Sequence, residues 1–166
     1  MTDQTAKTNT VKIKDLAGRY RSVDEDALIL QAKACIEERF KAGIALTSSA
    51  ASEEYLKVLI GDYEREVFYV VRLNNQHEVL KSGILFEGTI DGSMVHPREV
   101  LKDALSCNAA AVIFAHNHPS GNPEPSQADI SITRRLKNAL ALIDIRVLDH
   151  LIVGSTVTSL ASRGLL

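Results

Sequence analysis

Two histidines that follow an apolar segment carry the first indication of chemistry in this sequence. His116 and His118 come directly after residues 109–115, which are apolar throughout, as is typical of a central strand. Side chains two residues apart on a strand point to the same face, about 6–7 Å apart at the backbone. This spacing suits two ligands of one metal ion. A His-x-His pair alone is weak evidence, because chance produces one in roughly one chain in seven.

Asp129, eleven residues after His118, is the candidate for a third ligand. It falls in the first turn of a helix that we predict over residues 126–143, and from there a carboxylate can reach back over the end of the strand. Three protein ligands leave the fourth tetrahedral position of zinc to water, which is typical of catalytic sites. Alternatively, Ser126 and Asp129 form a capping box, and Asp129 only interacts with the helix dipole. The combined pattern, with Pro119, arises by chance in about 1 chain in 10⁴ or fewer, which favours the metal site.

The spaced residues His116-x-His118-Pro119-x₆-Ser126-x-x-Asp129 resemble the JAMM motif of the MPN-domain metallopeptidases. Shorter segments resemble the RadC branch of that family: Gly88–Thr89, His96–Glu99, Asn108–Ala111, His116–Gly121 and Leu148–Leu151. The resemblance covers roughly residues 43–166. It implies an α/β fold, the MPN/JAMM fold, with a curled mixed β-sheet flanked by helices. It also implies that Zn²⁺ is bound by His116, His118 and Asp129.

The same resemblance assigns the general base to Glu66, at the start of a strand that we predict over residues 66–73. A general base accepts a proton from water and returns it to the leaving amine. A solvated glutamate at a strand end is the alternative interpretation. Ser126 can donate its hydroxyl to a developing oxyanion or only stabilise the helix as its N-cap residue, and the two roles are compatible. His150, inside an apolar strand, is either a hydrogen-bonded core residue or a residue that orients a metal ligand.

The function that the resemblance implies is that of a zinc-dependent metallopeptidase, which cleaves peptide or isopeptide bonds in a peptide or protein substrate. Asn117 replaces the serine or threonine of the deubiquitinase branch, so ubiquitin is not implied as the substrate. The alternative is an accessory module associated with DNA repair, in which the metal only stabilises the fold. Two other metal enzymes are excluded. A metallo-β-lactamase requires Asp and His at positions 120 and 121, and a zinc deaminase requires a Pro-Cys-x-x-Cys segment.

The elements that must position these residues form a single mixed sheet with helices. We predict a helix over residues 21–42, opened by a capping box at Ser22, and a second helix over residues 52–60. Strands are predicted at residues 66–73, 78–87, 109–115 and 145–153, and further helices at residues 97–107 and 126–143. Three parts are therefore expected along the chain: a flexible basic arm (1–20), an N-terminal helix (21–42) and the MPN domain (43–166).

The composition agrees with one globular domain. The chain has 166 residues, of which 45% are hydrophobic and 24% charged, so a disordered or fibrous chain is excluded. The length also excludes a (β/α)₈ barrel, which needs about 250 residues. The net charge is −2, but residues 7–21, which include most of the arm, are basic, with Lys7, Lys12, Lys14, Arg19 and Arg21 against Asp15. The arm either contacts nucleic acid or is a solvated tail.

We expect a cytoplasmic protein without a membrane segment. The two cysteines, Cys35 and Cys107, can form neither a disulfide framework nor a CxxC metal site. Residues 1–10 contain no apolar stretch of the kind found in signal peptides. No apolar run reaches the ~18–20 residues that a transmembrane helix requires. The sequence does not indicate an oligomeric state.

Overall fold

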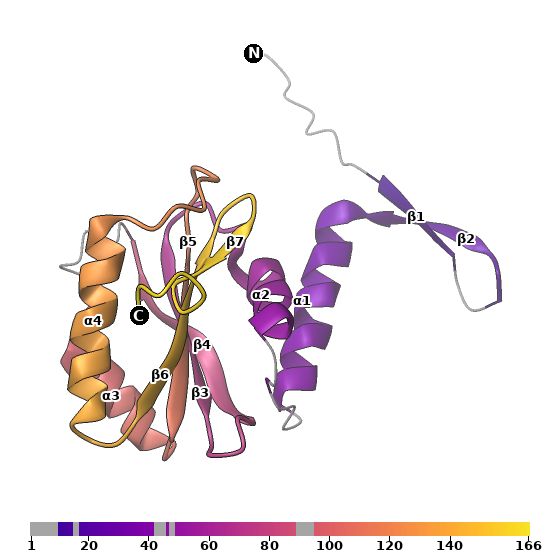
Figure 1. The fold of residues 1–166 in the computed structure, drawn as a ribbon. Helices are drawn as coiled ribbons and strands as arrows, with labels where there is room; N and C mark the ends of the chain where they lie inside the picture. Colours follow the sequence, from indigo (N-terminus) through magenta and orange to yellow (C-terminus); the bar gives the residue numbers. More distant parts are fainter. Residues whose placement is uncertain (1–9, 15–16, 42–45, 47–48, 89–94) are drawn as a thin grey trace, which may run out of the picture. The chain divides into compact units, whose positions relative to one another are not determined.

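The computed structural model describes residues 10–14, 17–41, 46, 49–88 and 95–166. Contacts within the chain define two units, Met1–Arg39 and Phe40–Leu166, and each is described by itself. Figure 1 shows the helices and strands of both units. Within the described ranges, no helix combines enough length with enough apolar character to cross a bilayer.

The first unit begins with a β-hairpin. β1 (Thr10–Lys14) pairs with β2 (Tyr20–Asp24) in antiparallel register, with Thr10 opposite Asp24 and Lys14 opposite Tyr20. The flexible arm expected over residues 1–20 therefore contains β1 and Tyr20, the first residue of β2, while residues 1–9, 15 and 16 lie outside the described residues. The alternation of β-branched residues with lysines in β1 is a strand pattern, but the high charge of this segment conceals it.

α1 (Glu25–Lys41) follows the hairpin directly. The helix predicted over residues 21–42 therefore begins too early, because residues 21–24 belong to β2. The predicted capping box at Ser22 is also wrong. The Oδ1 of Asp24 instead accepts a hydrogen bond from the backbone N–H of Ala27 at 3.1 Å. Ser and Asp are both preferred N-cap residues. Ser22 is paired with Lys12 in the hairpin and therefore belongs to β2, so Asp24 is the residue that precedes the helix.

The second unit is built on a five-stranded mixed sheet with the strand order β4-β3-β5-β6-β7. Its strands are β3 (Val67–Leu73), β4 (Val79–Glu87), β5 (Ala111–Asn117), β6 (Arg146–Val153) and β7 (Val157–Ser159). β5 and β6 are parallel, and all other neighbours are antiparallel. The four predicted strands are confirmed, with ends shifted by at most two residues. β7 was not predicted, because three residues are too few to show a strand pattern.

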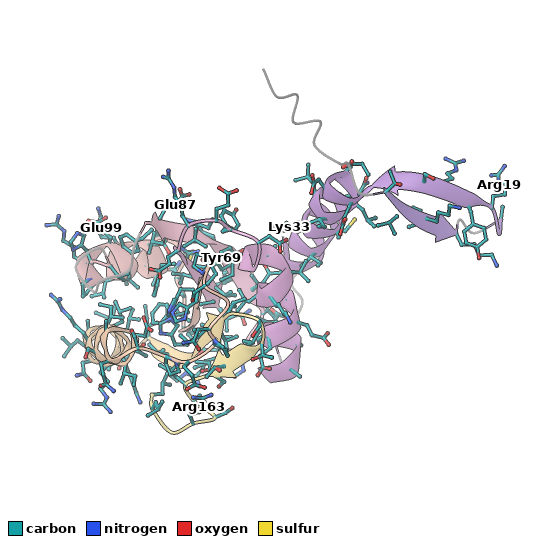
Figure 2. The ribbon with its side chains drawn as sticks, turned by 90° about the horizontal axis from the view of Figure 1, so that it is seen from above. Arg19, Lys33, Tyr69, Glu87, Glu99 and Arg163 are labelled. Atoms are coloured by element: carbon teal, nitrogen blue, oxygen red, sulfur yellow. The ribbon has the colours of Figure 1, made fainter. Side chains whose placement is uncertain are left out.

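Helices cover both faces of the sheet. α2 (Ser49–Ile60) lies against one face, and α3 (Pro97–Ser106) and α4 (Gln127–Ala141) lie against the other (Figure 1). On the α2 face, the hydroxyl of Tyr69, labelled in Figure 2, is 3.4 Å from the hydroxyl of Tyr55. The core of the other face comprises Phe68, Val70, Val112 and Phe114 of the sheet, Val100 and Ala104 of α3, and Ile132, Leu136 and Leu140 of α4. The predicted α/β architecture, a mixed sheet flanked by helices, is confirmed.

β5 is the central strand, and all 7 of its residues are buried. Directly opposite residues of neighbouring strands share a face, and Phe68 is opposite His116. His116 therefore points to the side of α3 and α4, whereas Asn117 points to the side of α2. Since α4 connects β5 to the parallel strand β6, the start of α4 follows the tip of β5 after a short loop.

Candidate metal centre

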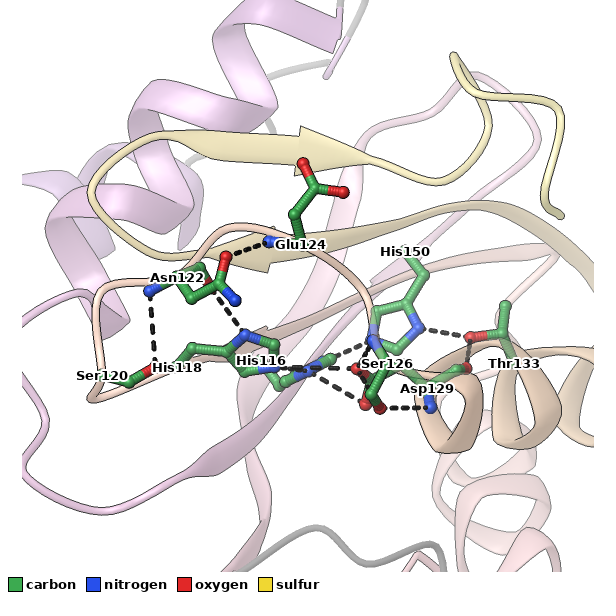
Figure 3. Close-up of polar contacts among 9 residues, drawn as sticks. All are labelled: His116, His118, Ser120, Asn122, Glu124, Ser126, Asp129, Thr133 and His150. Atoms are coloured by element: carbon green, nitrogen blue, oxygen red, sulfur yellow. Dashed lines mark hydrogen bonds and ion pairs between the residues drawn. The ribbon is translucent and has the colours of Figure 1, made fainter.

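The end of β5 and the first turn of α4 bring the three predicted ligands together. The Nε2 atoms of His116 and His118 are 3.0 Å apart, and Oδ1 of Asp129 is 3.2 Å from Nε2 of His116. Oδ2 of Asp129 is 3.7 Å from Nε2 of His118. One ligand atom from each residue lies within 4.8 Å of the others. Figure 3 shows the three side chains pointing toward one another.

These separations fit a tetrahedral zinc ion. Two ligands that are each about 2.0–2.1 Å from zinc are about 3.3 Å apart at the tetrahedral angle. The three measured separations lie between 3.0 and 3.7 Å. His116 and Asp129 are only 1% and 2% exposed, whereas His118 is partly exposed. The cluster is therefore closed toward the core and open on the side of His118.

Ser126 connects the start of α4 to the cluster. Its Oγ accepts a hydrogen bond from the backbone N–H of Asp129 at 3.1 Å, and its own backbone N–H and hydroxyl donate to Oδ2 of Asp129, each at 2.7 Å. The capping box and the ligand cluster, which the sequence offered as alternatives, are thus both present. The capping box occupies Oδ2 and leaves Oδ1 facing His116. The oxyanion role of the Ser126 hydroxyl stays a prediction.

Asp129 is buried but ionised at neutral pH. Burial alone would raise the pKa of its carboxyl group. When His116 and His118 carry a proton on Nε2, they donate hydrogen bonds to this carboxylate, and these bonds, together with the hydroxyl of Ser126, outweigh burial and hold this pKa well below its usual range. The ionised carboxylate is the form that binds a cation, so the metal-free cluster already has the charge that a divalent ion requires.

The ring of His118 is held by a backbone carbonyl group. Its Nδ1 lies 2.7 Å from the carbonyl oxygen of Asn122, and since a carbonyl only accepts, Nδ1 carries the donated proton. In the neutral ring, Nε2 then directs its lone pair toward His116 and Asp129. The Asp129 carboxylate raises the pKa of His118 above its usual value of 6.5. Burial opposes this increase, and the carbonyl of Asn122 and the charge of Glu66 add to it.

The affinity for zinc is expected to fall as the pH is lowered. A proton on Nε2 of His118 occupies the position of the metal, and because Asp129 raises the pKa of His118, this competition begins above pH 6.5. The affinity should be constant well above that pKa and fall about tenfold per pH unit below it. Zinc titrations against a competing chelator, corrected for protonation of the chelator, measure the profile. An affinity that does not change with pH would contradict the assignment of His118 as a ligand.

Gly154, in the turn between β6 and β7, allows the loop that holds His118 to approach closely. A Cβ at this position would lie 2.6 Å from the carbonyl oxygen of Gly121 and 2.9 Å from the carbonyl carbon of Asn122. The same turn binds the loop through the backbone N–H of Ser155, which donates to the Gly121 carbonyl at 2.8 Å. The Asn122 carbonyl that orients His118 is therefore fixed by backbone packing against the sheet.

Gly154→Ala is expected to destabilise the protein by about 1–3 kcal/mol, because the atoms that a Cβ would meet belong to the backbone and cannot rotate away. The displaced Asn122 carbonyl would also lose its hydrogen bond with His118, so the affinity for zinc should fall. Thermal unfolding of the metal-free variant measures the first effect, and a zinc titration measures the second. A wild-type melting temperature would show that the turn does not pack against the loop.

Glu66 lies immediately before β3, on the open side of the cluster. Phe68 is opposite His116, and this register, continued by two residues, would place Glu66 across from His118. The Glu66 carboxylate is close enough to raise the pKa of His118, in addition to the larger effect of Asp129. The strand predicted over residues 66–73 thus begins one residue later than expected, and Glu66, which directly precedes it, is half-buried.

Asn117, between the two histidines, points to the opposite face and fixes the segment that carries Glu66. Its Oδ1 accepts a hydrogen bond from the backbone N–H of Val67 at 2.8 Å. Its Nδ2 donates to the carbonyl groups of Tyr63 and Arg65 at 2.9 and 3.1 Å. Since Asn117 is 1% exposed, water does not compete for these bonds. The residues on both sides of Glu66 are thereby tied to the strand tip that carries the ligands.

A cavity of about 530 Å³ opens beside Glu66. It is lined by Glu64, Arg65, Glu66, Gly88, Pro119 and Ser120. The lining comes from the segment before β3, the end of β4 and the loop that follows His118. The cavity therefore adjoins the open side of the ligand cluster.

His150 and Thr133 contact the ligands from the side of the core. Nδ1 of His116 is 2.8 Å from Nε2 of His150, and Nδ1 of His150 is 2.5 Å from Oγ1 of Thr133. The Thr133 hydroxyl also donates to the carbonyl oxygen of Asp129 at 2.5 Å. Burial, together with repulsion from His116, keeps the pKa of His150 well below 6.5. His150 is a buried, hydrogen-bonded residue that also contacts His116, so its contacts agree with both interpretations of the sequence: a core residue and a residue that orients a metal ligand. Thr133 was not predicted, although its position one helical turn after Asp129 could have indicated it.

Comparisons with known proteins extend over this whole cluster. The family model described as the RadC-like JAB domain matches residues 46–165. A UPF0758 protein of Vibrio cholerae is 52% identical over 140 residues, which cover 84% of this chain and 89% of that protein. A UPF0758 protein of Marinobacter nauticus is 50% identical over 157 residues, which cover 94% of this chain and 70% of that protein. The matched residues include the five-stranded sheet, α2, α3, α4 and the three candidate ligands.

Proposed function

The chain belongs to the RadC-like JAB domain family, and from this premise we propose that it is a zinc-dependent metallohydrolase of the JAMM type. Its substrate is a peptide or protein, in which it cleaves a peptide or isopeptide bond. The observation that carries this proposal is the open cluster of three ligands with a carboxylate beside it. A purely structural zinc ion usually has four protein ligands. The catalytic domain in this proposal spans residues 43–166.

His116, His118 and Asp129 would hold the ion. When bound, Zn²⁺ lowers the pKa of a coordinated water toward about 7 and polarises a carbonyl group. Asp129 supplies the negative charge, and the two imidazoles supply neutral nitrogen ligands. The buried side of the cluster excludes water, while the partly exposed His118 leaves access from the cavity.

Glu66 is the general base in this proposal, and Ser126 is the oxyanion donor. The Glu66 carboxylate accepts a proton from the attacking water and later delivers it to the leaving amine nitrogen. Three hydrogen bonds of Asn117 support this role, because they fix the backbone on both sides of Glu66. The Ser126 hydroxyl would have to turn from Oδ2 of Asp129 toward the substrate oxygen, and its exposed position allows this rotation.

Metal analysis and a peptide screen test the proposal together. The protein is purified without a chelator, and about one equivalent of zinc is expected on the intact chain. The loaded protein is then incubated with a mixture of peptides, and new amino termini are identified by mass spectrometry. Cleavage should stop on addition of a chelator and return with zinc. A folded chain that retains no zinc and cleaves no peptide would overturn the proposal.

One face of the β1–β2 hairpin favours a second candidate function. The cross-strand pairs Lys12–Ser22 and Lys14–Tyr20 put these four side chains on the same face, and the ammonium group of Lys14 lies 5.8 Å from the centre of the Tyr20 ring. Cationic side chains beside an aromatic ring are suited to the phosphates and bases of nucleic acid. We propose as this alternative that the chain is an accessory module in DNA transactions that binds nucleic acid through the hairpin.

The salt dependence of DNA binding tests whether the hairpin contacts nucleic acid. If Lys12 and Lys14 each contact a phosphate, the double variant Lys12→Gln/Lys14→Gln should reduce the slope of log affinity against log salt by about 1.8. The variant Lys102→Gln/Lys137→Gln removes the same charge from exposed positions of α3 and α4 and serves as the control. Equal slopes for both variants, or no binding by the wild-type chain, would exclude the hairpin as a nucleic-acid site.

We also propose that the protein acts in the cytoplasm. Cys35 and Cys107 are both free thiols, which is typical of a reducing compartment. Labelling of the two thiols in freshly lysed cells without reductant tests this assignment, because a protein from an oxidising compartment would carry blocked cysteines.

A further inference from the structure

A chain of hydrogen bonds connects the ligand His116 to the backbone of the ligand Asp129 through the core. It runs from Nδ1 of His116 to Nε2 of His150 at 2.8 Å, and from Nδ1 of His150 to Oγ1 of Thr133 at 2.5 Å. It ends on the carbonyl oxygen of Asp129, 2.5 Å from the same Oγ1 (Figure 3). His150 and Thr133 are both completely buried, so water does not take part in this chain.

The positions of the protons in this chain follow from its fixed end. The carbonyl oxygen of Asp129 can only accept, so the single proton of the Thr133 hydroxyl is directed at it. The Thr133 oxygen then has no proton for His150 and must accept one from Nδ1 of that ring. A neutral His150 therefore has a bare Nε2, and Nδ1 of His116 must donate to it.

These hydrogen bonds, followed from Thr133 through His150, define the tautomer of His116. With its proton on Nδ1, the neutral ring has a bare Nε2, which is 3.2 Å from Oδ1 of Asp129 and 3.0 Å from Nε2 of His118. The opposite tautomer would place an N–H between these atoms, where it would donate to the Asp129 carboxylate and block the approach of a metal ion. The direction of the Thr133 hydroxyl proton thus decides whether Nε2 of His116 is free to bind a metal ion or is blocked by a proton.

We propose that His150 and Thr133 are positioning residues that hold His116 in the tautomer that binds the metal. The inference rests on the metal site of the proposed function and adds to it a determinant of metal affinity that lies outside the ligand set. The rings of Phe68 and Phe114 surround His150 at centroid distances of 5.5 and 5.9 Å and fix its orientation. His118 needs no such chain, because the Asn122 carbonyl sets its tautomer directly.

Thr133→Val tests the proposal, because valine preserves the branched shape and removes the hydroxyl. Without an acceptor for Nδ1 of His150, the blocked arrangement becomes favoured. Loss of a residue that orients a metal ligand typically lowers metal affinity about 10- to 100-fold, and we expect a decrease in this range. Thr133→Ser restores the hydroxyl and should restore the affinity. Thr158→Val, at a buried position on β7 where the hydroxyl contacts Arg163 and not a histidine, is the matched control and should bind zinc like the wild type.

NMR of the metal-free protein gives a second measurement that needs neither zinc nor activity. Long-range ¹⁵N–¹H spectra of the imidazoles report which nitrogen of His116 carries the proton. We expect Nδ1 in the wild type and in Thr133→Ser, and Nε2 in Thr133→Val. An unchanged tautomer in folded Thr133→Val would overturn the inference. If the wild-type chain binds no zinc, the proposed function fails, but the tautomer measurement still decides whether the hydrogen-bond chain works as inferred.

Discussion

Replacing His118 with alanine is expected to remove stoichiometric zinc from the protein. His118 supplies one of three ligands, and its Nε2 lies 3.0 Å from Nε2 of His116. Zinc binding by small structural domains with four ligands contributes about 10–16 kcal/mol in total, so one ligand accounts for about 2.5–4 kcal/mol and its loss for about a hundred- to thousandfold weaker binding. Zinc titration against a chelator measures the change, and metal analysis of the purified variant shows whether any zinc remains.

The effect of His118→Ala can be separated from a loss of folding. His118 is the most exposed of the three ligands, so its truncation leaves the core intact. His77→Asn is a matched control, since His77 lies outside the cluster and asparagine tolerates its positive φ of 61°. Circular dichroism should show the same fold for both variants. If His118→Ala is folded and still binds one zinc ion with wild-type affinity, the ion lies elsewhere.

Glu66→Gln is expected to abolish most of the hydrolytic activity without loss of zinc. Glutamine has the shape of glutamate but cannot accept the proton, and removal of a general base typically costs about 10²- to 10⁴-fold in rate. The rate is measured on the peptide that the screen identifies, and zinc content is measured in parallel. Because Glu66 lies beside the cluster and is not one of its three ligands, the metal affinity should change little.

Glu64→Gln is the matched control for this experiment. Glu64 lines the same cavity and is exposed, so its substitution removes an equal negative charge close to that of Glu66. An effect that arises only from the local charge would appear in both variants, whereas loss of the base appears only in Glu66→Gln. Equal activity of Glu66→Gln and the wild type would mean that another group moves the proton.

The sequence predicts the ligand cluster because each of its parts is a local pattern. The period of two at the end of β5 orients His116 and, one residue after the strand, His118 together, and the capping pattern of Ser126 fixes the start of α4 and with it Asp129. The β1–β2 hairpin was missed because its strand pattern extends over five residues in a segment of high charge. Its pairing also determines that α1 begins at Glu25 and not near Ser22.

The supporting residues cannot be predicted in this way, since they depend on contacts between distant segments. Asn117 binds backbone atoms about 50 residues earlier in the chain. The position of His150 depends on the register of β6 against β5, which shifts between Val112 and Ile113. Neither an apolar strand nor its period indicates such a shift. Tertiary pairing, which no local pattern encodes, therefore decides which of the five histidines contact the ligands.

The alternation of the last two residues of β5 limits how this segment can change in evolution. His116 and Asn117 point to opposite faces, one toward the metal cluster and the other toward the backbone around Glu66. Insertion or deletion of a single residue within the strand would exchange the two faces, because the side-chain period is two. Both tasks would then be lost in one event. We therefore expect length differences among related proteins to avoid β5 and to occur in surface loops, while β5 itself changes only by substitution.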